Sequence, residues 1–134
     1  MKLNSRISSQ PRKMRKYLYN LPHHMRLKMM VAPLTKEARE KYGIKRIPIR
    51  KGDTVIIQKG RFKGVVGKVV ELLPKKLRVY VEGVTIKRAG GATRYYPIYP
   101  WNVKIIELDL SDSRRKEMIE RKKVSKSEEA TKTE

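Results

Sequence analysis

The sequence predicts a mostly β fold, a small twisted barrel with a basic N-terminal extension containing short helices and with a C-terminal helix. Short β-prone runs lie between residues 54 and 108, and the run at 76–82 alternates apolar and polar side chains most clearly. Turns rich in glycine separate the runs at 60–64 and at 89–92. We therefore divide the 134-residue chain into an extension over 1–48, a barrel over 49–110, and a C-terminal helix with a disordered tail over 111–134.

The composition predicts a polyanionic partner. The chain has 34 Lys and Arg against 13 Asp and Glu, a net charge of +21, and residues 1–50 alone carry 14 basic against 2 acidic side chains. Such an excess repels itself unless a polyanion neutralises it, so nucleic acid is the first candidate and an anionic membrane surface the second. There is no cysteine, no apolar run of about 18 residues that could span a bilayer, and no secretory leader. We expect a cytoplasmic protein without a cofactor.

The first 20 residues are too polar to fold alone. Basic residues crowd together at positions 12–16, and Tyr17 and Tyr19 follow them. Aromatic side chains next to cations suit stacking on nucleotides. A solvated tail is the alternative for such a charge run, although the same sign over 50 residues favours a bound polyanion.

Two short helices are expected before the barrel. Pro22 suits the first turn of a helix over 23–31, in which Met25, Met29 and Met30 share one face and pack. The adjacent histidines of this helix diverge and lack a third ligand nearby, so we expect no metal site. Thr35 predicts the N-cap of a second helix that ends at Gly43.

The barrel begins with two strands, at 54–59 and 65–73, around a turn. Gly60 and Gly64 bracket Arg61, Phe62 and Lys63 in this turn. The cations can bind phosphates, and the phenyl ring offers an apolar face to a base or a sugar. Glycine in the second strand, at position 67, indicates a bulge or a tight corner.

The remaining barrel strands are expected at 76–82, 84–87, 93–96 and 103–108. A turn at 74–76 precedes the first of them and presents charge at its tip. Pro97 and Pro100 interrupt any continuous ladder, so Tyr99 and Trp101 lie on an irregular connection. This pair is either an aromatic plug over one end of the barrel or a contact with a partner. Ser111 is expected to cap the final helix, which loses its apolar residues after position 125.

The start of the barrel region carries a characteristic spacing of glycine, lysine and valine, formed by Gly52, Asp53, Val55, Gly60, Lys63, Gly64, Gly67, Lys68 and Val69. This pattern resembles the KOW motif of ribosomal proteins and of some transcription elongation factors. The resemblance implies an SH3-like barrel and a function that involves RNA or a ribonucleoprotein.

A longer stretch is similar to one family of large-subunit ribosomal proteins, number twenty-four in the universal naming and twenty-six in the eukaryotic naming. The similarity runs over roughly residues 10–123 and includes 32–37, 47–53, 80–84, 96–98 and 102–103. The long extension resembles the archaeal–eukaryotic branch, whereas Tyr99 and Trp101 depart from the family's usual His and Ser. The resemblance implies a structural protein that binds the 5′ region of large-subunit rRNA, acts early in assembly and lies near the peptide exit tunnel beside other ribosomal proteins.

Cations, aromatics and one glycine of these segments are the expected RNA-binding residues. They are Arg12, Lys13, Arg15, Lys16, Tyr17, Tyr19, His23, His24, Arg26, Lys28, Arg46, Arg50, Lys51, Lys59, Arg61, Phe62, Lys63, Gly64, Lys68, Lys75, Lys76, Arg78 and Arg94. We expect no enzymatic activity, no small-molecule substrate and no membrane partner. A KOW-module transcription elongation factor is the main alternative, although such a protein brings an α/β domain for which residues 1–50 are too short.

Overall fold

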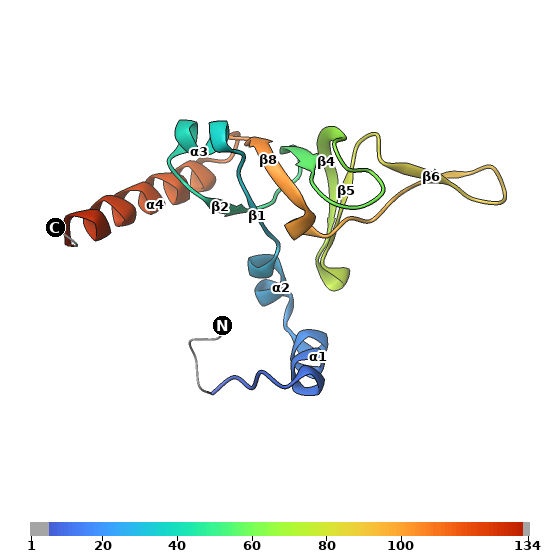
Figure 1. The fold of residues 1–134 in the computed structure, drawn as a ribbon, viewed down its shortest axis with the longest axis horizontal. Helices are drawn as coiled ribbons and strands as arrows, with labels where there is room; N and C mark the ends of the chain where they lie inside the picture. The colour runs from blue at the N-terminus through green and yellow to red at the C-terminus, as the bar shows by residue number, and fades with distance from the viewer. Residues whose placement is uncertain (1–5, 133–134) are drawn as a thin grey trace.

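The computed structural model describes residues 6–132, with side chains to residue 123, and combines helices with antiparallel sheets (Figure 1). The helices are α1 (Pro11–Asn20), α2 (His23–Met29), α3 (Lys36–Tyr42) and α4 (Ser113–Lys132), with two 3₁₀ turns, η1 (Pro74–Lys76) and η2 (Pro100–Asn102). The strands are β1 (Val31–Pro33), β2 (Arg46–Pro48), β3 (Thr54–Ile57), β4 (Val66–Leu73), β5 (Arg78–Val81), β6 (Thr85–Lys87), β7 (Thr93–Tyr95) and β8 (Val103–Glu107).

The strands form three separate sheets. The central sheet has the order β5-β4-β3-β8, whereas β1 pairs with β2 and β6 pairs with β7. The β6–β7 hairpin projects from one side of the central sheet and α4 from the other (Figure 1). A bridge between Leu34 and Ile105 links the β1 segment to β8, and a bridge between Val79 and Ile98 extends the far edge. All the strands that the sequence predicts between residues 54 and 108 are present, and their ends lie within two residues of the expected positions.

The expectation of a mostly β chain is not confirmed, because the described residues mix helix and sheet. A closed barrel is not confirmed either, since the hydrogen-bonded central sheet has four strands and the β6–β7 hairpin forms a sheet of its own. At the edges of the central sheet, isolated single-residue bridges are found instead of continuous hydrogen-bonded strand pairs. The alternation of apolar and polar residues in the sequence predicts strands but does not specify such bridges.

One apolar core holds the fold together. It extends from Met30, which is 1% exposed, through the central strands to Ile119 of α4. Ala38 and Tyr42 bring α3 into the same core. The predicted division at residues 48 and 110 stays a prediction, but the core crosses both positions.

Local signals explain the short helices. The Thr35 hydroxyl accepts a hydrogen bond from the Ala38 N–H, and Gly43 ends α3 at a φ of +70°, as expected. Helix α2 stops at Met29, before the end of the expected helix over 23–31, and the chain turns into β1. Met30 therefore enters the core while Met29 stays exposed, so the expected shared methionine face is wrong.

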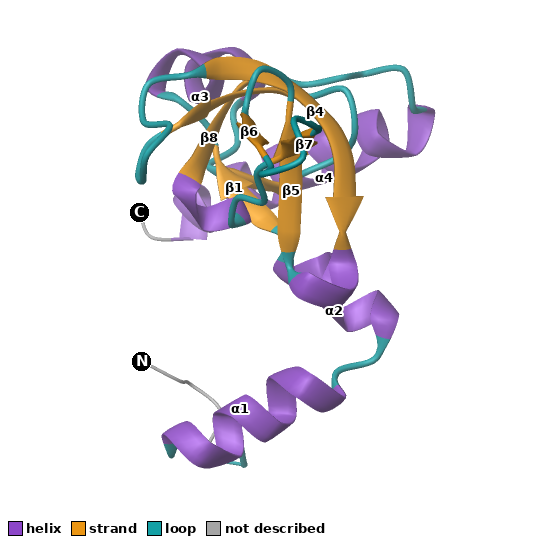
Figure 2. Cartoon of the chain, turned by 90° about the vertical axis from the view of Figure 1, so that its right-hand side faces the viewer, coloured by secondary structure: helices purple, strands orange, loops and turns teal. Residues whose placement is uncertain are grey.

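Helix α1 lies apart from the sheet, and α2 lies between them (Figure 2). Pro11 occupies its first turn, and none of its residues is buried. The absence of a buried face agrees with the sparse apolar content of this segment. Residues 1–5 lie outside the described part of the chain.

Helix α4 is attached to the sheet by a buried ion pair. Arg115 is 1% exposed and Asp53 is 0% exposed. The Arg115 Nη1 and Nη2 atoms donate to the Asp53 carboxylate at 2.5 and 2.6 Å. Nη1 also donates to the Asp109 carbonyl and Nη2 to the Pro48 carbonyl, at 3.0 and 3.3 Å. The guanidinium thus joins the start of α4 to both ends of the β2–β3 connection.

The start and the length of α4 differ from expectation. Asp112 rather than Ser111 caps the helix, because its Oδ1 accepts the Arg114 N–H at 3.0 Å. The Ser111 N–H instead donates to Asp109. The helix runs to Lys132, past residue 125 where the sequence predicts disorder. Lys and Glu are the commonest residues of this stretch, and their helix propensity is high.

Candidate nucleic-acid interface

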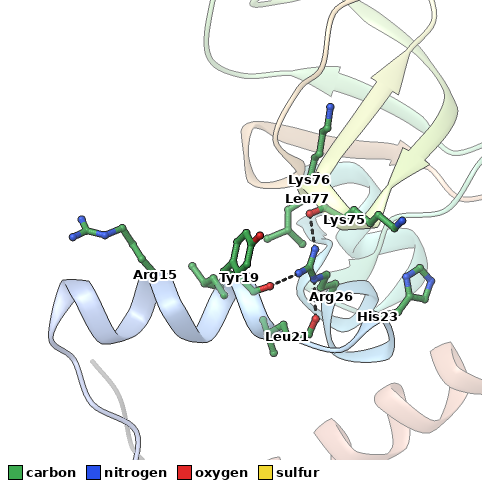
Figure 3. Close-up of a pocket in the computed structure, with 9 residues that line it drawn as sticks. Arg15, Tyr19, Leu21, His23, Arg26, Lys75, Lys76 and Leu77 are labelled. Atoms are coloured by element: carbon green, nitrogen blue, oxygen red, sulfur yellow. Dashed lines mark hydrogen bonds between the residues drawn. The ribbon is translucent and has the colours of Figure 1, made fainter.

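A pocket of about 720 Å³ lies where α1 and α2 meet η1 (Figure 3). We call it the N-terminal hollow; its lining residues are Arg15, Leu18, Tyr19, Leu21, His23, Arg26, Lys75, Lys76 and Leu77. Six of the expected RNA-binding residues therefore meet here from segments that are far apart in the sequence. The hollow therefore combines cationic side chains with the apolar side chains of Leu18, Leu21 and Leu77.

Arg26 fixes the shape of this hollow. Its guanidinium donates to the backbone carbonyls of Tyr19, Leu21 and Lys75, at 2.6, 2.9 and 2.6 Å. The three bonds tie the end of α1 to α2 and to η1 (Figure 3). Because three carbonyls occupy these donors, Arg26 holds the hollow's frame, and its expected contact with RNA stays a prediction.

A second pocket, of about 530 Å³, lies between β5 and the β6–β7 hairpin. We call it the hairpin hollow; it is lined by Leu73, Lys76, Arg78, Tyr80, Ile86, Arg88, Arg94, Tyr95 and Pro97. The Tyr80 and Tyr95 rings stack with their centres 5.8 Å apart. The hollow therefore combines four cations with two aromatic faces.

A third pocket, of about 220 Å³, lies under the turn at 60–64. We call it the loop hollow; it is lined by Ile57, Lys59, Gly60, Arg61, Phe62, Arg78, Tyr96, Pro97, Ile98, Tyr99 and Asn102. Gly60 and Gly64 have φ values of +100° and +88°, in the region that favours glycine. Phe62 packs against Tyr96 with ring centres 5.2 Å apart, and the Arg61 guanidinium lies 5.8 Å from the centre of the Phe62 ring.

The three hollows form one continuous surface. Lys76 lines both the N-terminal and the hairpin hollow, and Arg78 and Pro97 line both the hairpin and the loop hollow. Among the described residues that line them, none is an Asp or a Glu. Phosphate oxygens of a nucleic acid would therefore meet cations and aromatic faces without acidic repulsion.

Other expected residues lie outside this surface. Lys13, Lys16 and Tyr17 line a further pocket, of about 360 Å³, which shares Leu21 with the N-terminal hollow. The remaining ones are not brought together with the hollows: Arg12, His24, Lys28, Arg46, Arg50, Lys51, Lys63, Gly64 and Lys68.

Arg50 has an intramolecular partner. Its guanidinium pairs with the Asp112 carboxylate at the start of α4. Hydrogen bonds from Arg50 and from the Arg114 N–H lower the pKa of Asp112 below its ordinary value of 3.8. The pair stabilises the connection to α4, so part of the charge of Arg50 is already neutralised.

Sequence reasoning missed several residues of the surface. Arg88, Tyr80 and Tyr95 line the hairpin hollow but were not among the expected RNA-binding residues. The hairpin register opposes Thr85 to Tyr95 and Ile86 to Arg94, and the Arg88 N–H donates to the Ala92 carbonyl at 2.9 Å. Pairing the expected strands at 84–87 and 93–96 across their glycine turn would have pointed to this cluster.

Within residues 6–132 no helix combines the length and apolar character that crossing a bilayer requires. Among the side chains that the structure describes, up to residue 123, no three or more His, Cys, Asp or Glu residues form a cluster that could hold a metal ion.

Comparison with known proteins points to one family. The sequence profile of the ribosomal proteins L26 (eukaryotic) and L24p (archaeal) matches residues 8–122. The chain is also similar to the large ribosomal subunit protein uL24 of the archaeon Pyrobaculum islandicum. The two are 50% identical over 116 residues, which are 87% of this chain and 94% of the relative.

Proposed function

The chain belongs to the family of ribosomal proteins L26 of eukaryotes and L24p of archaea, and we propose that it is a structural rRNA-binding protein of the large ribosomal subunit. Its place is then the ribosome, in the cytoplasm. Members of the family are structural proteins and not enzymes, so no catalytic site is assigned. The family match favours this function over a KOW-module transcription elongation factor.

The observation that supports rRNA binding is the continuous surface of the three hollows. Cations from α1, η1, β5, the turn at 60–64 and the β6–β7 hairpin line it, and no acidic side chain interrupts it among the described lining residues. Arg and Lys side chains displace counterions from phosphates, and aromatic faces accept bases or sugars. The expected RNA-binding residues outside the hollows would then extend the interface.

Finer features of the function remain part of the proposal. We assign the bound RNA to the 5′ region of large-subunit rRNA, and the protein to an early step of assembly near the peptide exit tunnel, among neighbouring ribosomal proteins. These features rest on the resemblance to the family. We also propose that the central sheet is an SH3-like barrel left partly open, because the Val79–Ile98 bridge carries the β5 edge toward the segment that enters β8.

The salt dependence of binding tests this proposal. Arg61→Ala with Arg94→Ala removes one cation from the loop hollow and one from the hairpin hollow. We expect weaker binding to an rRNA fragment, and a plot of log affinity against log salt that is shallower by about 0.7–0.9 for each phosphate that the variant no longer neutralises. The control is Lys36→Ala with Lys45→Ala, which removes the same charge from exposed side chains outside the hollows. Equal slopes for both double variants would contradict the assigned surface.

A further inference from the structure

Three side chains form a layered stack between the loop hollow and η2. The Arg78 guanidinium carbon lies 3.4 Å from the centre of the Tyr99 ring, and its Nη2 donates to the Tyr99 hydroxyl at 2.6 Å. The Tyr99 and Trp101 rings stack at 4.6 Å with an angle of 15° between their planes. A guanidinium this close covers one face of the tyrosine ring, so the indole lies against the other face. The order of the stack is Arg78, Tyr99, Trp101.

The indole at the end of this stack is exposed. Trp101 remains 53% exposed although Tyr99 stacks on one face of its ring. The face opposite Tyr99 is the one that is left for another ring. A large flat apolar face at the end of an ordered stack is a surface on which another planar π-system can lie.

The backbone around Trp101 is held in place. Pro100 is buried, and the Val103 N–H donates to its carbonyl. The Asn102 N–H donates to the Tyr99 carbonyl at 3.1 Å, and the Asn102 carbonyl accepts the Gln58 N–H at 2.8 Å. The turn that carries Trp101 is thus hydrogen-bonded to the end of β3. Because this turn is already ordered, the indole loses less conformational entropy on binding than a side chain on a mobile loop would.

The surroundings favour RNA over a protein partner. Tyr99, which stacks on Trp101, and Asn102, which follows it in the chain, line the loop hollow together with Lys59 and Arg61. These cations suit the phosphates on either side of a stacked base, and no acidic side chain is among the described residues of this hollow. Base–aromatic stacking beside a basic groove is the usual arrangement for unpaired RNA.

We propose that the exposed face of Trp101 binds one unpaired nucleobase of the RNA, which extends the Arg78–Tyr99–Trp101 stack by one ring. This inference rests on the proposed rRNA binding and deepens it, because it names the chemical group that this part of the surface recognises. A fully paired helix keeps its bases stacked on one another and leaves none for the indole. The site therefore selects a loop, a bulge or a strand end.

The chain offers a direct probe, because Trp101 is its one tryptophan. The intact protein is titrated with oligoadenylate of about six nucleotides, a length within the usual range for single-strand sites. An abasic ribose-phosphate strand of the same length and a paired RNA hairpin serve as comparison ligands. We expect oligoadenylate to quench the indole fluorescence, and the abasic strand to bind without quenching.

A neutral substitution separates stacking from charge. Trp101→Ala is expected to weaken oligoadenylate binding about fivefold or more, since a stacked base is worth about 1–3 kcal/mol. The salt slope should stay unchanged, because an indole displaces no counterion. Trp101→Phe should recover part of the affinity, and Leu27→Ala, an exposed apolar control outside the hollows, should have no effect. Unchanged thermal unfolding of each variant shows that the fold is intact.

The outcomes distinguish the two proposals. Quenching by oligoadenylate together with weaker binding by Trp101→Ala supports the stacking site. Salt-dependent binding without quenching, and with equal affinity for Trp101→Ala, overturns the stacking site and leaves rRNA binding in place. Failure of Trp101→Ala to enter subunits, at unchanged RNA affinity, overturns it in favour of a protein neighbour. No binding of oligoadenylate or of the rRNA fragment overturns both.

Discussion

At the scale of single residues, Asp53 organises the junction between the central sheet and α4. Its carboxylate accepts hydrogen bonds from both terminal nitrogens of Arg115 and from the N–H groups of Arg50 and Asp109, the latter two at 2.9 and 3.0 Å. A buried charge is tolerated only when it is paired and hydrogen-bonded in this way. Asp53 therefore has a structural role, although its stretch of sequence resembles a motif associated with RNA binding.

Removal of Arg115 should destabilise the protein strongly. Arg115→Ala leaves the Asp53 carboxylate buried without its partner, and we expect a loss of about 3–5 kcal/mol in the free energy of unfolding. Urea unfolding followed by circular dichroism measures the change. The neighbouring Arg114 is exposed, so Arg114→Ala should change stability by no more than about 0.5 kcal/mol. Equal midpoints for the two variants would contradict the structural role of the ion pair.

Close approach of two strands should make Gly67 sensitive to substitution. A Cβ atom at this position would lie 2.4 Å from the Glu82 carbonyl oxygen, which is backbone and cannot rotate away. We expect Gly67→Ala to cost about 1–3 kcal/mol, the usual range for overpacking. Gly90→Ala is the matched control, because nothing lies within 4 Å of its added Cβ. If both variants unfold at the same urea concentration, the close approach is not present in solution.

At the scale of elements, the first turn of α4 depends on ionised carboxylates. Hydrogen bonds from Arg50 and from the Arg114 N–H lower the pKa of Asp112. Hydrogen bonds from the Ser111 N–H and side chain lower the pKa of Asp109. A carboxylate whose pKa is lower in the folded state stabilises the fold above its ordinary pKa, and this contribution disappears as the pH falls through the folded value. The stabilisation should therefore be present at neutral pH and fade below about pH 3.8.

Asp112→Asn tests this dependence. The amide oxygen can still accept the Arg114 N–H, but the charge that pairs with Arg50 is gone. We expect the variant to be less stable than the wild type at pH 7 and the difference to shrink as the pH falls below the folded-state pKa. Urea midpoints measured from pH 7 to pH 2 check this, with Glu120→Gln as a control of equal charge change on the exposed side of α4. A difference that persists unchanged at pH 2 would contradict an electrostatic origin.

Elements with local signals were predictable from the sequence, and contacts between distant segments were not. Thr35 and Gly43 mark the ends of α3 because their effects act within one turn. The cap of α4 was misassigned because Ser111 and Asp112 are both good caps, and the pairing with Arg50 from another segment favours the second. The family resemblance is confirmed, whereas the expected closed barrel is not.

The basic character of the interface was predictable, but its shape was not. Cations and aromatics are visible in the composition, and several of those expected meet in the three hollows. The grouping depends on Arg26, whose carbonyl partners join the end of α1 to η1. Arg26 and its partner Lys75 are 49 residues apart in the sequence. The periodicity of apolar side chains predicts helices and strands, but it does not predict hydrogen bonds between one side chain and the backbone of distant segments.

At the scale of the whole molecule, folding and RNA binding use different parts of the chain. The core spans Met30 to Ile119, whereas α1 buries no residue. Removal of residues 1–20 should therefore leave the urea midpoint nearly unchanged and reduce the salt slope of RNA binding, because six cations are removed. Urea unfolding followed by circular dichroism, and filter binding at several salt concentrations, would measure the two effects. A large drop in stability with an unchanged slope would reverse the assignment.

A fragment of residues 49–110 should be much less stable than the intact chain. It lacks Arg115, the β1–β2 pair and the buried side chains of α3, so it leaves Asp53 unpaired and part of the core exposed. The proton NMR spectrum of the fragment should be poorly dispersed, whereas a fragment of residues 21–123 should keep dispersed amide signals. A well-dispersed spectrum from the shorter fragment would show that the sheet folds without its flanking elements.

The central claim is that the continuous surface of the three hollows is where this protein binds rRNA. Electron cryo-microscopy of the large subunit that contains the protein tests it most directly. We predict phosphate oxygens within hydrogen-bond distance of cations in all three hollows, including Lys76 and Arg78, which join one hollow to the next. A map in which the hollows face solvent, while the rRNA lies against α3, would contradict the claim.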